Sequence, residues 1–267
     1  GVSPLGYSFW QSLGPAILIG LVCLFRTGKL PIQFKHTTFY LVSGLTGIVI
    51  PNTTMYFAAS HLPASILAII VNTVPIIAYP LALLTQLEKF HWQRFIGIGL
   101  ALCGLLCIIL PKSSLPSAEM IPWVLSTLIT PLSFAICSIY IARYRPKAVD
   151  SLNLAAGMLA FSSLLLCPLI LLSQGFYWFH YPLLNADWIV LMEIVLSSLG
   201  YILFFQLLKM AGPVYYSLVD TIVVMTGVFW GYMIFNEHLN IWTGAAVCLI
   251  TLGLLLVTGY QRRAQHD

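Results

Sequence analysis

Long apolar segments recur along this chain, and the short stretches between them carry most of its charged residues. A helix needs roughly 20 apolar residues to cross about 30 Å of hydrocarbon. Backbone amides in hydrocarbon must pair within their own segment or in a closed barrel, whose strands have only about 10 residues. The sequence therefore predicts an all-α polytopic membrane protein. The nine predicted transmembrane helices are residues 4–25, 37–58, 64–84, 95–110, 121–141, 152–173, 187–209, 215–235 and 241–260.

The composition excludes most other classes of protein. Hydrophobic residues make up 60% of the 267 residues and charged residues only 7%, whereas about a quarter of a typical soluble domain is charged. A soluble domain of this size could not cover its surface with so few charges, and disordered chains are far more polar. The solvent around this protein is therefore mostly lipid.

Basic residues fall almost entirely on one side of the predicted membrane. With nine spans, 11 of the 12 lysines and arginines lie in loops or a tail that share one side, and only Lys112 lies on the other. Because basic loops stay in the cytoplasm, we predict a cytoplasmic C-terminus and place residue 1 outside. The net charge of +4 is thereby explained without a nucleic-acid partner.

The first predicted span begins almost at residue 1, and no charged region of a signal peptide precedes it. A chain of nine spans that starts outside is awkward to insert into a membrane. We therefore expect a tenth, N-terminal helix before residue 1 in the parent protein.

An internal repeat of about 149 residues supports the same expectation. The segment 121–141 has no partner in the first half, and its partner would lie just before residue 1. We predict a first repeat at 1–112, a second at 119–260 and a tail at 261–267. Repeats with an odd number of spans insert with opposite topology, as in many transporters; the alternative is that duplication only built a larger helical bundle. The matching residues are Pro63 and Pro213, Glu88 and Glu237, Gly97 and Ala246, and Gly104 and Gly253.

Five prolines lie inside predicted spans, at positions 51, 75, 80, 131 and 168. Proline removes a helical hydrogen bond, and in membrane bundles it commonly marks a kink beside a cavity. Pro75 is expected to free the carbonyl of residue 71, next to Asn72.

The motifs taken in order resemble the EamA-like family of the drug/metabolite transporter superfamily. This resemblance implies ten helices in two inverted repeats, cytoplasmic termini and a central cavity for small metabolites, in a plasma membrane such as the bacterial inner membrane. The sequence departs from the family in lacking the first helix, in having Gln11 where many members have arginine, and in having Val224 and Met225 where a partner of Pro75 would lie. The motifs are Val2-Ser3-Pro4-Leu5, Leu62-Pro63-Ala64, Pro75, Glu88 with Gly97 and Gly104, and the echo of Glu237 with Gly253.

Two carboxylates lie inside predicted spans. Glu193 is about 9 Å from the outer end of its helix and Asp220 about 8 Å from the inner end of its helix, at 1.5 Å per residue. A charge at mid-bilayer costs roughly 2.5–3.5 kcal/mol, so such acids are candidate functional groups. Each is predicted to bind a cationic group or a proton, near opposite mouths. The alternative is a structural bond to a neighbouring serine, tyrosine or lysine, such as Lys209 for Asp220.

Further polar and aromatic residues are predicted to line the central cavity. Ser197 and Tyr201 continue the helix face of Glu193, and Tyr216 precedes Asp220 by one turn. Individual serines and threonines in membrane helices usually bond to their own helix or pack. Together, aromatic and neutral polar groups suit a zwitterionic or amphipathic organic solute. The other predicted cavity residues are Asn52, Tyr56, Asn72, Tyr79, Trp123, Thr127 and Thr130.

Other residues are interpreted as structural. Glu88 ends a helix, as Glu237 does, and is expected to meet a helix N-terminus or a basic neighbour such as Lys89 or Arg94. The six cysteines all lie within spans and are interpreted as small apolar packing groups rather than metal ligands.

These features favour a secondary transporter, an exporter or exchanger of small organic metabolites such as amino acids, that works by alternating access. No phosphate-binding G-x-x-x-x-G-K-[ST] loop is present, so protons, another gradient or a counter-substrate must drive transport. We predict no catalytic residue, metal or cofactor, and the expected partners are the solute and the lipid bilayer. The alternatives are a non-transporting receptor or scaffold and an intramembrane enzyme, although G-x-S-x-G and H-E-x-x-H motifs are absent from the sequence.

Overall fold

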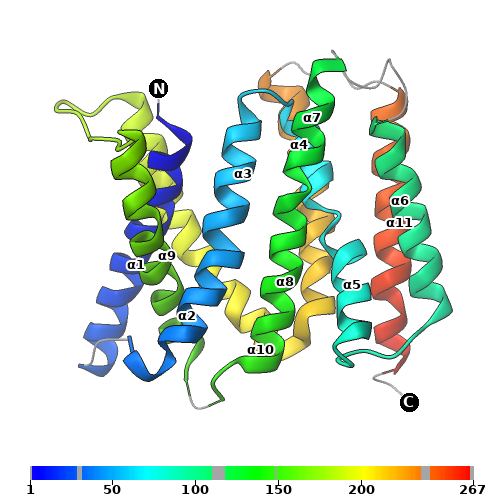
Figure 1. Cartoon of the computed structure of the whole chain (residues 1–267), viewed down its shortest axis with the longest axis horizontal. Coiled ribbons are helices and arrows are strands. Elements are labelled where there is room, and N and C mark those ends of the chain that lie inside the picture. Colours follow the sequence, from blue (N-terminus) through cyan, green and yellow to red (C-terminus); the bar gives the residue numbers. More distant parts are fainter. Residues whose placement is uncertain (1, 29–31, 110–117, 148, 236–240, 265–267) are drawn as a thin grey trace. The chain divides into compact units, whose positions relative to one another are not determined.

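The computed structural model describes residues 2–28, 32–109, 118–147, 149–235 and 241–264, and within these ranges all regular structure is helical (Figure 1). The prediction of an all-helical fold is therefore confirmed for this part of the chain. The α-helices are α1 (Pro4–Thr27), α2 (Thr37–Gly44), α3 (Ile50–Ala59), α4 (Ala64–Val71), α5 (Val74–Leu84), α6 (Trp92–Ile109), α7 (Ile121–Thr127), α8 (Ile129–Tyr144), α9 (Ser151–Ser173), α10 (Asn185–Phe235) and α11 (Ile241–Ala264). Three short turns of other helix types are η1 (Phe34–His36), η2 (Leu45–Val49) and η3 (Ala118–Met120).

Five predicted spans coincide with helical stretches that are long and apolar enough to cross a membrane. Two more, 95–110 and 241–260, coincide with shorter apolar stretches. The predicted span 215–235 has helical backbone, but several of its side chains lie outside the described structure. The five long stretches are Pro4–Arg26, Ala64–Leu84, Ile121–Tyr144, Ser151–Ser173 and Asn185–Leu207.

The turn predicted between residues 187–209 and 215–235 is not formed. The backbone of α10 is helical from Asn185 to Phe235 and continues through residues 212–214. Pro213 lacks a backbone N–H, which is why it predicted a turn. Membrane helices nevertheless tolerate proline where neighbouring groups satisfy the carbonyl that it leaves free, so this boundary prediction was wrong.

Prolines interrupt two predicted spans as expected. The span 64–84 divides into α4 and α5 at Asn72 and Thr73, with Pro75 in the first turn of α5. At the break, the Thr73 amide and hydroxyl both donate to the carbonyl of Ile70, at 3.0 and 2.7 Å. The span 121–141 divides in the same way into α7 and α8, at Leu128 and three residues before Pro131.

The span 37–58 is divided by a π-helical turn rather than by a break in the helix. The π-helical turn η2 joins α2 to α3 and ends at Val49, two residues before Pro51. Proline cannot donate the hydrogen bond of a regular α-turn, and a π turn inserts one extra residue into the helix. The residues of α3, among them Asn52 and Tyr56, are thus rotated about the helix axis relative to a regular continuation of α2.

The chain forms two compact units, each with segments from both predicted repeats. Unit 1 contains residues 1–56 and 140–210, and unit 2 contains residues 57–139 and 211–267.

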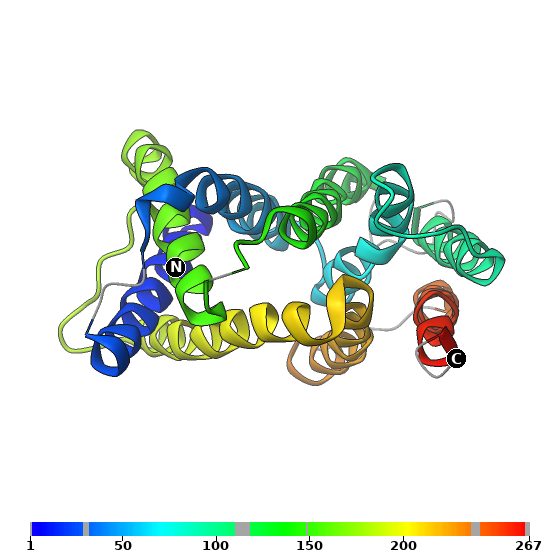
Figure 2. The ribbon, with the colours of Figure 1, turned by 90° about the horizontal axis from the view of Figure 1, so that it is seen from below.

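In unit 1, α1 and α9 pack against each other (Figure 2). Ser3, the N-cap of α1, donates a hydrogen bond to the carbonyl of Gly175, just beyond the end of α9. Near the opposite end of the pair, Cys23 of α1 interacts electrostatically with Asp150, the N-cap of α9. The start of each helix therefore meets the end of the other.

In unit 2, α6 and α11 also pack in antiparallel orientation, and glycines allow their backbones to approach closely. A Cβ atom placed on Gly104 would lie 3.0 Å from the carbonyl of Ala246, and one on Gly253 would lie 3.0 Å from the Cβ of Ala101. Small residues at such crossings let membrane helices associate through van der Waals packing.

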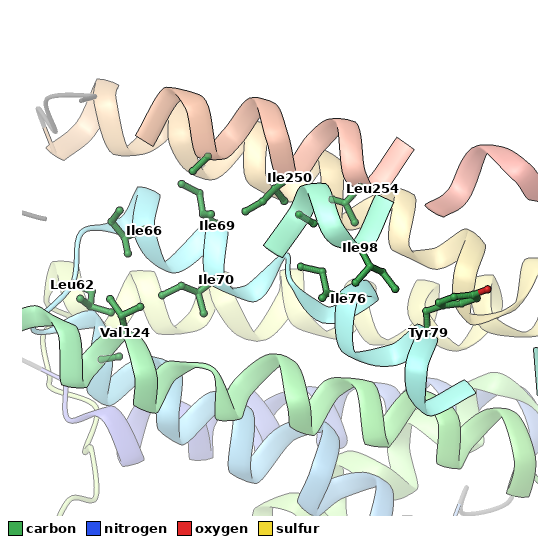
Figure 3. Close-up of a cluster of buried hydrophobic side chains, with 13 residues drawn as sticks. Leu62, Ile66, Ile69, Ile70, Ile76, Tyr79, Ile98, Val124, Ile250 and Leu254 are labelled. Atoms are coloured by element: carbon green, nitrogen blue, oxygen red, sulfur yellow. The ribbon is translucent and has the colours of Figure 1, made fainter. Parts of the chain in front are cut away.

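The core of unit 2 is built mainly from branched aliphatic side chains (Figure 3). They come from the turn before α4 and from α4, α5, α6, α7 and α11, and are less than 9% exposed. Lipid gives little hydrophobic driving force for the association of helices. The helices of this unit are therefore held together mainly by the van der Waals packing of these side chains. The labelled core residues are Leu62, Ile66, Ile69, Ile70, Ile76, Tyr79, Ile98, Val124, Ile250 and Leu254.

Candidate functional site

A cluster of polar side chains lies within unit 1, where α1, α3 and α10 come together. On each helix the contributing residues are four positions apart, so they share one face. We call this group the polar cluster. Its members are Tyr7 and Gln11 of α1, Asn52 and Tyr56 of α3, and Glu193, Ser197 and Tyr201 of α10.

Gln11 bonds to the other two helices of the cluster. Its Oε1 atom accepts hydrogen bonds from Asn52 Nδ2 at 2.6 Å and from the Tyr56 hydroxyl at 2.5 Å. Its Nε2 atom donates to Glu193 Oε1 at 2.6 Å. One amide thus connects α1, α3 and α10.

Glu193 is surrounded by neutral hydrogen-bond donors. Besides Gln11, the hydroxyl of Ser197 donates to Glu193 Oε1 at 2.6 Å, and the hydroxyl of Tyr7 also bonds to this carboxylate. The described hydrogen-bond partners of Glu193 are thus an amide, a serine and a tyrosine, and none of them is basic. The cluster contains a carboxylate and no basic group, which makes it attractive to a cation or a proton.

The aromatic members give the cluster an apolar wall. The rings of Tyr7 and Tyr56 meet edge to face, with centroids 5.0 Å apart and an interplanar angle of 87°. Tyr201 lies close enough to Tyr56 for an electrostatic interaction. Asn52 is buried, while the other six side chains are half-buried.

A close helix contact brings Gln11 within reach of Glu193. Gly14 lies one turn beyond Gln11, and a Cβ atom there would lie 2.5 Å from Cγ1 of Ile194, the residue after Glu193. Any larger side chain at this position would push α1 and α10 apart. The glycine therefore sets the separation that the 2.6 Å bond between Gln11 and Glu193 requires.

The aromatic segment between α9 and α10, which contains Tyr177, is hydrogen-bonded to both α1 and α10. The indole of Trp10 donates to the carbonyl of Tyr177 at 2.9 Å. The buried carboxylate of Asp187 accepts hydrogen bonds from the Tyr177 hydroxyl at 2.6 Å and from the Leu184 amide at 2.8 Å. The bond to Asp187, together with burial, raises the pKa of Tyr177 to about 12. These bonds hold the segment in place. Asp187, to which it bonds, lies about a turn and a half before Glu193 on α10.

The other predicted cavity residues whose side chains are described lie in unit 2, where the observed contacts are structural in character. The Tyr79 hydroxyl accepts from the His91 amide at 2.7 Å and donates to the carbonyl of Lys89 at 3.2 Å, which fixes the turn between α5 and α6. The Trp123 ring stacks on His61, with centroids 3.7 Å apart.

Three smaller side chains complete the predicted set in unit 2. The hydroxyl of Thr127 donates to the carbonyl of Trp123 in its own helix at 2.6 Å. Asn72 and Thr130 are almost fully buried, and Asn72 lies at the break between α4 and α5. Irregular backbone at membrane depth is tolerated where protein or a water-filled cavity surrounds it.

Tyr216 and Asp220 lie on the helical backbone of α10, and their side chains are outside the described part of the structure. The predicted alternative pairing of Asp220 with Lys209 is therefore outside it too. Their roles stay predictions.

The predicted pairing of Glu88 with a basic neighbour is confirmed. Arg94 Nη1 donates to Glu88 Oε2 at 2.5 Å, and the guanidinium lies 5.3 Å from the ring centroid of Tyr79. Arg94 is only 1% exposed. This buried ion pair stabilises the turn that also holds the Tyr79 hydroxyl.

Sequence reasoning did not include Tyr7 and Gln11 in the candidate site. The available signal was their four-residue spacing inside the first span, which matches the spacing of Asn52 and Tyr56. Gln11 was noted only as a departure from the family pattern. For metals, no group of three or more His, Cys, Asp or Glu side chains suitable for an ion occurs among the described residues.

Comparison with known families decides what kind of protein carries this site. The model of the EamA-like transporter family matches residues 1–110 and 121–259. The chain belongs to this family. As an EamA-like transporter it is an integral membrane protein and not an enzyme, and its family membership implies secondary transport of small solutes.

The fold of this EamA-like transporter is also found among solved structures. A crystal structure that carries no functional name has 13% sequence identity and a TM-score of 0.69, over 99% of this chain and 91% of that one. At this identity the likeness concerns the fold alone. No curated protein matches the sequence.

Proposed function

We propose that this EamA-like transporter moves small organic solutes, such as amino acids or related metabolites, by alternating access, as an exporter or exchanger. The observation that carries the proposal is the polar cluster around Glu193. It places a carboxylate, two amides, a serine and three tyrosines on facing helices of a membrane protein. Intramembrane acids of this kind mark solute or proton pathways.

The proposed solute carries a cationic group on an otherwise neutral or zwitterionic body. Glu193 supplies the negative charge, and the tyrosine rings favour cations through their π faces. Gln11, Asn52 and Ser197 supply neutral donors and acceptors for the remaining polar groups. A proton is the alternative occupant of Glu193, so proton exchange is the coupling that we propose.

The proposed mechanism rests on two repeats of opposite topology, at 1–112 and 119–260. The reciprocal contacts of α6 and α11 support it: Gly104 meets Ala246, and Gly253 meets Gly97. Adding the repeat offset of 149 to Gly97 and Gly104 gives Ala246 and Gly253, so the two contacts exchange under the repeat. An antiparallel pair of this kind is expected around a two-fold axis in the membrane plane. The antiparallel contacts of α1 with α9 and the two separate family matches are further support.

The proposed orientation places the C-terminus in the cytoplasm of a plasma membrane, such as the bacterial inner membrane, because basic residues cluster on that side. It is tested by labelling cysteines introduced into the basic loops of intact cells with a membrane-impermeant reagent. Labelling from outside would contradict it.

Transport itself is tested by counterflow in proteoliposomes. Metabolites that raise the unfolding temperature of the purified protein are loaded inside, and entry of labelled solute is measured with and without a pH gradient. We expect Glu193→Gln or Asp220→Asn to abolish the dependence on the gradient, while Glu119→Gln, a change at an exposed acid, retains it. Unchanged dependence in both variants would remove the acids from the mechanism. A solute that binds but does not exchange would identify a receptor instead.

A further inference from the structure

The bonding of Gln11 fixes the orientation of its amide. The Oε1 atom of an amide accepts two hydrogen bonds, and in Gln11 both come from α3, from Asn52 and Tyr56. The NH₂ group is consequently directed to α10, where it donates to Glu193. Two bonds thus join α1 to α3 through Gln11, and the bonds of Gln11 and of Tyr7 to Glu193 join this pair to α10.

The bond to α10 depends on the charge of Glu193. A hydrogen bond to an ionised carboxylate is roughly twice as strong as one between neutral groups. The titratable groups that interact with Glu193 are Tyr7 of α1 and Tyr56 of α3, and Tyr201, on the same helix as Glu193, interacts with Tyr56. Glu193 is the carboxylate of the polar cluster, whose other members are phenols, amides and a hydroxyl, so it is the member that a proton would neutralise. The next charged groups along the chain are Asp187 and His180, which bond to each other at 3.5 Å.

We propose that Gln11 is the positioning residue that couples the charge of Glu193 to the packing of α1 and α3 against α10. This inference rests on the function proposed above. While Glu193 is charged, the amide of Gln11 holds α10 against the other two helices. When a proton neutralises Glu193, this bond weakens and the two bonds to α3 do not, so α1 and α3 stay together and α10 is released. The equilibrium between the bonded and the separated arrangement shifts by about tenfold.

The first test needs no solute and uses protons as the probe. Unfolding temperatures of the full chain in detergent are measured at about pH 8 and about pH 3, which bracket the titration of ordinary carboxyl groups. Gln11→Met keeps the length of the side chain and removes its hydrogen bonds. We expect Gln11→Met to lower the unfolding temperature clearly at the higher pH and much less at the lower pH. In a Glu193→Gln background, we expect the decrease in unfolding temperature to be small at both pH values.

The matched control is Ser12→Ala. Ser12 is the adjacent residue of α1, and its hydroxyl bonds within α1 to the carbonyl of Ser8. Its loss should therefore have the same effect at both pH values. A Gln11→Met effect that is equal at both pH values, or equal with Glu193 and with Gln at position 193, would overturn the proposal.

The second test measures the pH profile of counterflow in proteoliposomes. We expect the wild-type rate to change about tenfold between the two pH values and the Gln11→Met rate to change little, with Ser12→Ala resembling the wild type. A Gln11→Met variant with the wild-type profile would refute the coupling. Absence of counterflow in the wild type would refute the proposed function alone, because the unfolding experiment still decides the role of Gln11.

Discussion

The crossing of α6 and α11 makes a quantitative prediction for Gly253→Ala. The added methyl group would lie less than 3.0 Å from the carbonyl oxygen of Gly97 and 3.0 Å from both the amide nitrogen and the Cβ of Ala101. Two of these three atoms are backbone, which cannot move aside by a change of rotamer. The two helices would have to separate along their whole contact.

The expected loss follows from two opposing effects. Replacing glycine by alanine in a helix is favourable by up to about 1 kcal/mol, whereas overpacking a close contact costs about 1–3 kcal/mol. Because the clash is with backbone, we take the upper end, which leaves a net loss of about 2 kcal/mol in the free energy of unfolding. At roughly 2–4 °C per kcal/mol for a chain of this size, the unfolding temperature should fall by about 4–8 °C.

The assay is thermal unfolding in detergent at a fixed heating rate, with two controls on the same helices. At Gly99 of α6 and Gly244 of α11, an added Cβ would have no other atom within 4 Å, so alanine there should be neutral or stabilising. Gly104→Ala should fall between these cases, because its nearest contact, at 2.7 Å, is a side-chain atom of Ile250. A Gly253→Ala protein as stable as Gly244→Ala would refute the close antiparallel crossing.

Three further predictions follow from local contacts. Gly14→Ala should reduce counterflow several-fold and lower the unfolding temperature. Its methyl group would collide with Ile194 of α10 and move Gln11 away from Glu193. Normal counterflow in this variant would argue against the close separation of α1 and α10. The wild type should lose stability as the pH rises from about 10 to about 12, since Tyr177 stays protonated in the folded state up to a pKa of about 12 and its ordinary value is about 10; Tyr177→Phe should lose less over that range in alkaline unfolding experiments. Arg94→Met should lower the free energy of unfolding by about 3–5 kcal/mol, because it leaves Glu88 as an unpaired charge in the turn. Combining Arg94→Met with Glu88→Gln should restore part of this free energy in the same unfolding assay.

Some features of the site could be predicted from the sequence. Glu193, Ser197 and Tyr201 follow one another at four-residue intervals, so their common helix face could be predicted from helical geometry alone. Asn52 and Tyr56 share a face for the same reason. Both stripes were assigned to one central cavity, but their connection through Gln11 could not be predicted, because nothing in either segment specifies which neighbouring helix it will face.

Other features depended on long-range contacts. Tyr7 and Gln11 have no local property that distinguishes them from ordinary polar residues near a helix end, and their role depends on partners more than 40 residues away. Tyr79 had the right depth and spacing for a cavity residue, but its hydroxyl bonds to the turn between α5 and α6. The π turn before Pro51 and the continuous helix through Pro213 likewise depend on how surrounding groups satisfy the backbone.

The sequence by itself determined that the chain lies in lipid and where most of its spans begin and end. Hydrocarbon imposes these features locally, because each segment must be apolar over its length and must satisfy its own backbone. Only the tertiary structure decided that Gln11 connects Glu193 to Asn52 and Tyr56. Helix contacts in a membrane depend on shape and on a few directional hydrogen bonds, and both arise from residues that are distant in the chain.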